Sequence, residues 1–144
     1  DKTGSDLKTD KLFDVLYGNR HKFFGFIDYF RHFPTHTKQG GLADYYLYLE
    51  YKPFKSVSIR NIGHYFRLAK TNPLTPDNKN LGYENDLIAE YKFSEWGRIE
   101  SGYMFFLPTN TIRTIQNVQN NKFSQFIYLQ LTLTPILFKQ DEVF

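Results

Sequence analysis

Five long stretches of alternating residues constrain this chain more than any other feature. They read LADYYLYLEYK (42–52), VSIRNIGHYFRLA (57–69), LGYENDLIAEYKF (81–93), RIESGYMFFL (98–107) and FSQFIYLQLTLT (123–134). Alternation with a period of two predicts β-strands. Each stretch is about as long as a tilted membrane strand of roughly 9–11 residues, whereas strands of soluble proteins average nearer 5–6. The sequence therefore predicts an all-β, antiparallel fold with long strands.

The connections between these stretches alternate in length. Residues 53–56 and 94–97 are short links, and residues 70–80 and 108–122 are long links that carry Pro, Asn, Thr and Lys. In an antiparallel sheet this rhythm places both long connections at one end. Short periplasmic turns and long extracellular loops are typical of bacterial outer-membrane barrels. The order of the links therefore favours a transmembrane β-barrel over a soluble meander.

One face of every predicted strand is free of charge, apart from Arg67. This apolar face comprises the odd-numbered residues of 45–51, 57–65, 81–93, 99–107 and 123–133, Leu81 and Asn61 among them. Lys or Arg facing lipid at the bilayer midplane costs roughly 2–4 kcal/mol. We therefore expect the apolar face to meet lipid and the opposite, polar face to line a wet lumen. The predicted lumen-lining residues are Arg60, His64, Glu84, Asp86, Glu90, Lys92, Arg98, Glu100, Tyr128 and Gln130.

Aromatic residues, which are 19% of the chain, are sorted by height on the apolar face. One group lies near the short links, a second lies near the long links, and leucines such as Leu49, Leu87 and Leu129 lie between them. Two aromatic girdles around an aliphatic band match the two interfaces of a bilayer. The predicted girdle residues are Tyr45, Tyr51, Tyr65, Tyr83, Tyr91, Phe93, Trp96, Phe105 and Phe123.

A soluble β-sandwich or lipocalin-like barrel would also alternate its faces. Its charged face would then lie outside and its apolar face would form the core of a carrier for an apolar ligand. The strand lengths, the asymmetry of the links and the two girdles argue against this alternative, which nonetheless stays open at the level of sequence.

The expected organisation is an extracellular surface loop region (1–41), the C-terminal barrel strands (42–138) and a tail (139–144). Five strands is an odd number, whereas single-chain bacterial barrels have even numbers. We therefore expect these to be the last five or so strands of a larger barrel, completed by further strands before Asp1 or by another chain. A sixth strand within residues 21–30 is an alternative, although that stretch alternates poorly.

The order of several motifs resembles alginate-export-type outer-membrane porins, in particular Bacteroidetes-like members and their C-terminal portion. The resemblance covers nearly the whole chain, including residues 16–30 and 41–53. The residues that carry it are Gly82, Glu84, Asp86, Gly102, Tyr103, Tyr128, Leu129, Leu131 and Pro135. It implies a porin or exporter in the outer membrane of a Gram-negative bacterium that transports small polar or anionic saccharide-like solutes. A plugged barrel that serves as a membrane anchor or assembly subunit is the alternative function.

The last stretch also resembles the signal that the barrel-assembly machinery reads. The residues of this predicted assembly signal are Tyr128, Leu129, Leu131, Leu133 and Phe138, and Phe144 is a second candidate for its terminal aromatic residue. The expected partners are outer-membrane lipid, the assembly machinery, and the remaining strands or chain that complete the barrel.

No pattern in the sequence predicts an enzyme, a cofactor or a metal site. Glu84 and Asp86 could serve a hydrolase, but no Ser–His pair or metal motif accompanies them. His32 and His36 have a spacing that suits a metal, but a histidine pair in a loop is more often simply solvated. The charged residues of the polar face form either ion-selective rings or cross-strand pairs. The net charge of +3 is too small and dispersed to predict nucleic-acid binding.

Overall fold

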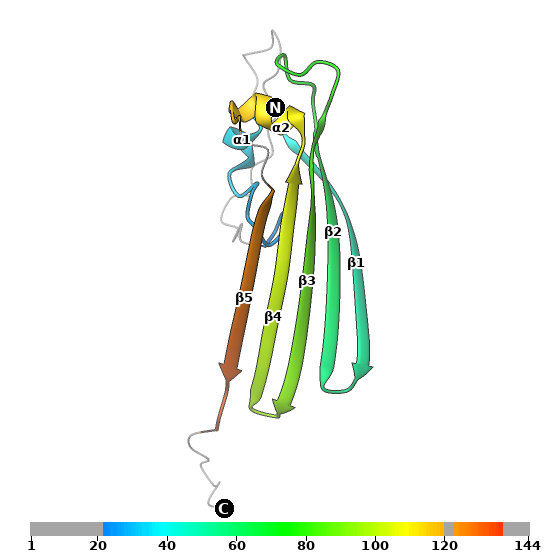
Figure 1. Ribbon diagram of the computed structural model, residues 1–144, viewed down its shortest axis with the longest axis vertical. Coiled ribbons are helices and arrows are strands. Elements are labelled where there is room, and N and C mark those ends of the chain that lie inside the picture. Colours follow the sequence, from blue (N-terminus) through cyan, green and yellow to red (C-terminus); the bar gives the residue numbers. More distant parts are fainter. Residues whose placement is uncertain (1–21, 120–122, 137–144) are drawn as a thin grey trace, which may run out of the picture.

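The computed structural model describes residues 22–119 and 123–136 and shows one five-stranded sheet in the order β1-β2-β3-β4-β5 (Figure 1). All neighbouring strands are antiparallel. The prediction of five long antiparallel strands is confirmed, with every boundary within two residues of the expected one. The strands are β1 (Leu42–Phe54), β2 (Val57–Leu68), β3 (Asn80–Ser94), β4 (Gly97–Pro108) and β5 (Ser124–Leu133).

The register also confirms that each strand has two distinct faces. Residues that lie opposite one another in an antiparallel pair point to the same side of the sheet. One row runs Tyr46, His64, Glu84, Phe106, and the adjacent row runs Leu47, Gly63, Asn85, Phe105. The even-numbered rows form the polar face and the odd-numbered rows form the apolar face, as the alternation predicts.

Leu81 is the exception, and its predicted place on the apolar face is wrong. The register shifts by one residue near the top of β3, because Phe66 pairs with Gly82 while Arg67 pairs with Asn80. Leu81 is thus an extra residue, and such a bulge reverses the alternation locally. Its side chain has no exposed surface and packs with Phe66 and Phe106, which belong to the polar side.

Two short helices, α1 (Phe33–His36) and α2 (Asn110–Gln116), lie at the end of the sheet that carries the long connections (Figure 1). The sequence predicted only a loop where α2 occurs. α2 ends at Asn117, whose left-handed conformation (φ 56°) lets its backbone N–H bond to the last carbonyls of the helix. Ile112 and Ile115 of α2 are buried. No helix in 22–119 or 123–136 has the length and apolar character needed to cross a membrane.

Residues 22–41, which precede β1, are here called the folded-back segment. The alternative of a sixth strand within 21–30 is not found in the described part of that stretch, because residues 22–30 form turns with only isolated bridges. Phe30 of this segment is fully buried in a cluster that also contains Phe66, Phe106 and Ile112. The main core of the described chain therefore lies on the polar side of the sheet, at its end nearest the helices.

Candidate functional site

The polar face of the sheet is the candidate site, because it carries the charged and hydroxyl side chains of the strands. The register places all ten predicted lumen-lining residues on this face. The face divides into two halves. The half toward the short turns is open, and the half toward the helices is covered by the folded-back segment.

The open half is organised around the Glu100 carboxylate of β4. The Arg60 guanidinium reaches across β3 from β2 and donates to Glu100 Oε2 at 2.6 Å, and the Tyr128 hydroxyl donates from β5 to Oε1 at 2.6 Å. Bonds of this length to a charged acceptor belong to the stronger class of hydrogen bonds. Three strands are thus tied together above Ile88, which is fully buried.

Gly102 provides the space in which the Tyr128 ring lies. The two residues are opposite one another in the β4–β5 pair, and a Cβ atom at residue 102 would overlap the Tyr128 ring. We therefore expect Gly102→Ala to displace the ring and to lower the free energy of unfolding by about 1–3 kcal/mol. Equilibrium unfolding of the full-length protein measures this, with Ser101→Ala on the opposite face as the control. Equal effects of the two substitutions would contradict the packing described here.

The other charged groups in the open half also pair with opposite charges. Lys52 Nζ lies 3.1 Å from Glu50 Oε2, and Arg98 Nη1 lies 3.8 Å from Glu90 Oε2. The second of these links β4 to β3. The hypothesis of cross-strand pairing therefore describes several of the predicted lumen residues, and such exposed pairs contribute little stability each.

In the covered half, Glu84 and Asp86 have no exposed surface. The folded-back segment lies over them, so these two predicted lumen residues do not contact solvent in the described structure. Instead, Glu84 Oε1 accepts from the backbone N–H of Ile27 at 2.9 Å, and Asp86 Oδ2 accepts from that of Phe26 at 3.2 Å. Among the described residues, the second oxygen of each acid, Glu84 Oε2 and Asp86 Oδ1, is buried without a hydrogen-bond partner. The two backbone bonds therefore offset only part of the cost of removing these acids from water.

His64 lies beside this carboxylate pair and is only 6% exposed. Its Nδ1 lies 2.9 Å from Asp44 Oδ2, and its Nε2 lies 3.8 Å from Asp86 Oδ2. The imidazole therefore bridges an acid of β1 and an acid of β3. Sequence reasoning placed His64 on the correct face but did not identify Asp44 as its partner.

Tight turns allow the folded-back segment to reach the carboxylates. Gly25 has a positive φ of +83°, and a Cβ atom at this position would overlap the Glu84 carboxylate. Asp28 also has a positive φ of 59°, and its carboxylate accepts from the backbone N–H of Lys22 at 3.0 Å. Only glycine adopts the Gly25 conformation without cost and leaves room for the acid.

Aromatic packing fixes the other end of the segment. The Phe30 ring lies 4.7 Å from that of Phe66, and the Tyr29 ring stacks on Phe106 at 4.3 Å. The Tyr29 hydroxyl donates to Gln116 Oε1 of α2 at 2.9 Å. Burial raises the pKa of Tyr29 above its usual value, so this hydroxyl keeps its proton at neutral pH. The segment and α2 therefore form one packed unit over the sheet.

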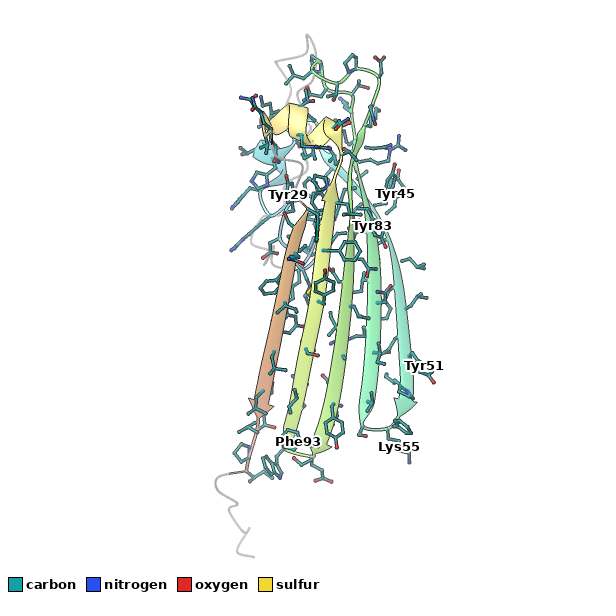
Figure 2. All side chains as sticks on the ribbon, viewed as in Figure 1. Tyr29, Tyr45, Tyr51, Lys55, Tyr83 and Phe93 are labelled. Carbon is teal, nitrogen blue, oxygen red and sulfur yellow. The ribbon has the colours of Figure 1, made fainter. Side chains whose placement is uncertain are left out.

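The apolar face has the opposite character, because no described residue covers it. Apart from Leu81, none of its residues is buried. Leu129 is 76% exposed, Ile127 is 74% exposed and Leu47 is 64% exposed. Figure 2 shows Tyr45 and Tyr83 near the helix end of the strands and Tyr51 and Phe93 near the short turns. The predicted girdle residues thus occupy two levels of an uncovered surface.

Asn61, Asn85 and Gly63 interrupt the apolar face, and the structure shows how each is accommodated. Asn61 lies opposite Leu87 and Asn85 lies opposite Gly63, so the two asparagines are diagonal neighbours. They exchange side-chain hydrogen bonds at 3.0 and 3.2 Å. Gly63 leaves space for the Tyr83 side chain, whose hydroxyl would lie 3.2 Å from a Cβ atom at residue 63. The two amides therefore satisfy one another's hydrogen bonds, and the Tyr83 side chain occupies the space beside Gly63.

Sequence reasoning missed the folded-back segment as part of the site. The signal for it was the stretch FFGFIDYF (23–30), which is rich in rings but does not alternate. Of the predicted assembly signal, Tyr128, Leu129, Leu131 and Leu133 lie in β5, whereas Phe138 and the alternative Phe144 lie outside the described residues. No group of three or more potential metal ligands occurs in the described part of the chain. No protein-family model, curated protein or solved structure matches this chain.

Proposed function

We propose that this chain forms part of the wall of a transmembrane outer-membrane β-barrel that passes small polar solutes. The observation that carries the proposal is the uncovered apolar face, on which leucines such as Leu49, Leu87 and Leu129 lie between two aromatic levels. Monomeric soluble proteins rarely expose contiguous apolar patches larger than a few hundred Å². Lipid satisfies such a surface, and the polar face then lines the lumen.

The spacing of the two aromatic levels fits a bilayer. Tyr83 and Phe93 are ten residues apart on β3. At about 3.4 Å per residue they are separated by about 34 Å along the strand, and a tilt of about 40° reduces this to about 26 Å of height. The apolar band of outer-membrane barrels is about 25 Å tall. The aromatic side chains would therefore lie at the two interfaces.

Burial on the polar side also favours the barrel over a soluble carrier. In a carrier the apolar face would form the core, whereas here Phe66, Ile88, Met104 and Phe106 of the opposite face are the buried residues. Within the described residues, β1 and β5 each pair with one neighbour only. Unpaired strand edges are not stable in lipid. The proposal therefore includes further strands, from this protein or from another chain, that close the barrel.

The resemblance to alginate-export-type porins supports small polar or anionic saccharide-like solutes as the cargo. The mixed charges of the open half, among them Arg60, Glu90, Arg98 and Glu100, give this wall no single charge preference. A barrel that serves as an anchor is the second candidate, and the folded-back segment favours it because the segment covers half of the polar face.

Membrane partition of the full-length protein tests the proposal. We expect extraction from membranes only with detergent, and a folded band on gels whose mobility changes on boiling. Single-channel conductance then separates the two candidates, because a channel conducts and an anchor does not. A protein that stays in solution without detergent and shows no change on boiling would contradict both and favour the soluble carrier.

The Asn61–Asn85 pair gives a second test of the lipid-facing side. In lipid, Asn85→Leu leaves the Asn61 amide without its partner, and we expect a loss of about 1 kcal/mol in the free energy of unfolding. The double replacement Asn61→Leu/Asn85→Leu leaves no unpaired amide and is expected to be more stable than either single variant. Unfolding of the three variants in lipid vesicles measures this. A double variant less stable than both single variants would contradict a lipid environment.

A further inference from the structure

The folded-back segment spans most of the width of the polar face. Its contacts include Phe66 on β2, Glu84 on β3 and Phe106 on β4. The Lys22 ammonium lies 5.7 Å from the centre of the Tyr128 ring on β5. The segment therefore crosses four strands, within the half of the sheet nearest the long connections.

Its attachment is specific and involves both its backbone and its side chains. The carboxylates of Glu84 and Asp86 each accept one backbone N–H of the segment, and the segment's own Phe30 side chain is buried against the sheet. Glycine is the only residue type that fits against the Glu84 carboxylate at position 25. A segment held in this way has one position on the sheet, which is a requirement for an element that shapes a passage.

A hollow of about 420 Å³ remains between the segment and the first two strands. Its lining includes the rings of Phe23, Phe26, Tyr46 and Tyr48, together with Lys22 and His64. Phe23 is 57% exposed and Tyr46 is 69% exposed, so these two rings present open surface on the polar side of the sheet. In the open half of the face, the Tyr128 ring lies among the polar side chains of Arg60, Glu100 and Gln130.

We propose that the folded-back segment is a constriction of the lumen and that the aromatic hollow is the passage it leaves. This inference rests on the proposed barrel and extends it. The size limit of the pore is set by the segment, and solutes pass against its rings. Solutes that combine a flat apolar surface with hydroxyl groups suit such a lining. The rings contact the apolar surface of the solute, and the neighbouring charged groups form hydrogen bonds with its hydroxyl groups.

Thiol modification in planar bilayers tests this without disturbing the fold. The full-length protein, in a background without other cysteines, carries Phe23→Cys, Gln130→Cys or Leu129→Cys. A bulky thiol reagent is expected to reduce the conductance of Phe23→Cys by about twofold or more, because it narrows the narrowest point. It should reduce that of Gln130→Cys less, and leave that of the lipid-facing Leu129→Cys unchanged. An effect at residue 130 equal to or larger than that at residue 23 would overturn the proposal.

Release of the segment provides the complementary measurement. Phe30→Ala removes its buried anchor, so larger neutral polyethylene glycols should enter the variant pore than enter the wild type. A wild-type pore that is closed and opens in the variant would make the segment a complete seal, and this result would contradict the aromatic hollow as a passage. If the wild type conducts and the largest polyethylene glycol that enters is the same in both proteins, the result would contradict the constriction but not the channel. Absence of conductance in both would contradict the proposed channel itself.

Discussion

Replacement of Phe30 by alanine is expected to lower the stability of the folded-back segment by about 3–5 kcal/mol, the usual cost of removing a buried aromatic ring. Phe30 has no exposed surface, and its ring lies 4.7 Å from Phe66 and 5.8 Å from Phe106. Alanine leaves a cavity among these rings that the rigid strands β2 and β4 cannot close. The segment should therefore open more often, and its amide hydrogens should exchange faster.

Phe23→Ala is the matched control, because Phe23 belongs to the same segment but is 57% exposed. Its removal is expected to change stability by less than about 1 kcal/mol. Hydrogen exchange of residues 24–31, measured by mass spectrometry on the folded full-length protein, compares the two variants. Equal exchange in Phe30→Ala and the wild type would show that the segment is held by something other than this core.

Arginine at residue 129 is expected to destabilise the protein by about 2–4 kcal/mol in a bilayer, because the charge would enter the apolar band near its midplane. Leu129 lies close to the middle of β5 on the apolar face. Gln130→Arg places the same charge one residue away on the polar face, where Gln130 is exposed. We expect this control to stay within about 0.5 kcal/mol of the wild type.

The comparison separates lipid from water. On a surface bathed by water, both arginines would be tolerated, because exposed substitutions away from special features change stability by only about 0.5 kcal/mol. Unfolding by urea in lipid vesicles gives both values for the full-length protein. A Leu129→Arg variant as stable as Gln130→Arg would contradict the assignment of the apolar face to lipid.

The strands and their faces could be predicted because both depend on local alternation. Residues such as Leu49 and Glu50 point in opposite directions wherever the chain is extended, and no tertiary information is needed to know this. The same rule fails at Leu81, where one extra residue reverses the alternation. The bulge follows from the pairing of Phe66 with Gly82, which is a property of two strands and not of one.

The covered half of the site could not be predicted for a related reason. The alternation of β3 puts Glu84 and Asp86 on the polar face, and the sequence therefore predicts that they face the lumen. Their burial depends on Phe26 and Ile27, which are about sixty residues away in sequence and approach through a turn at Gly25. Backbone N–H groups carry no sequence signature, so only the fold reveals them as the partners of these acids.

Accessibility of spin labels along β5 tests the central claim most directly. The 144 residues contain no cysteine, so single labels can be introduced at each position from 127 to 132 of the full-length protein in vesicles. We expect labels at 127, 129 and 131 to be relaxed by oxygen dissolved in lipid, and labels at 128, 130 and 132 by a water-soluble nickel chelate. Labels at all six positions that respond to the nickel chelate alone would contradict a strand with one face in lipid.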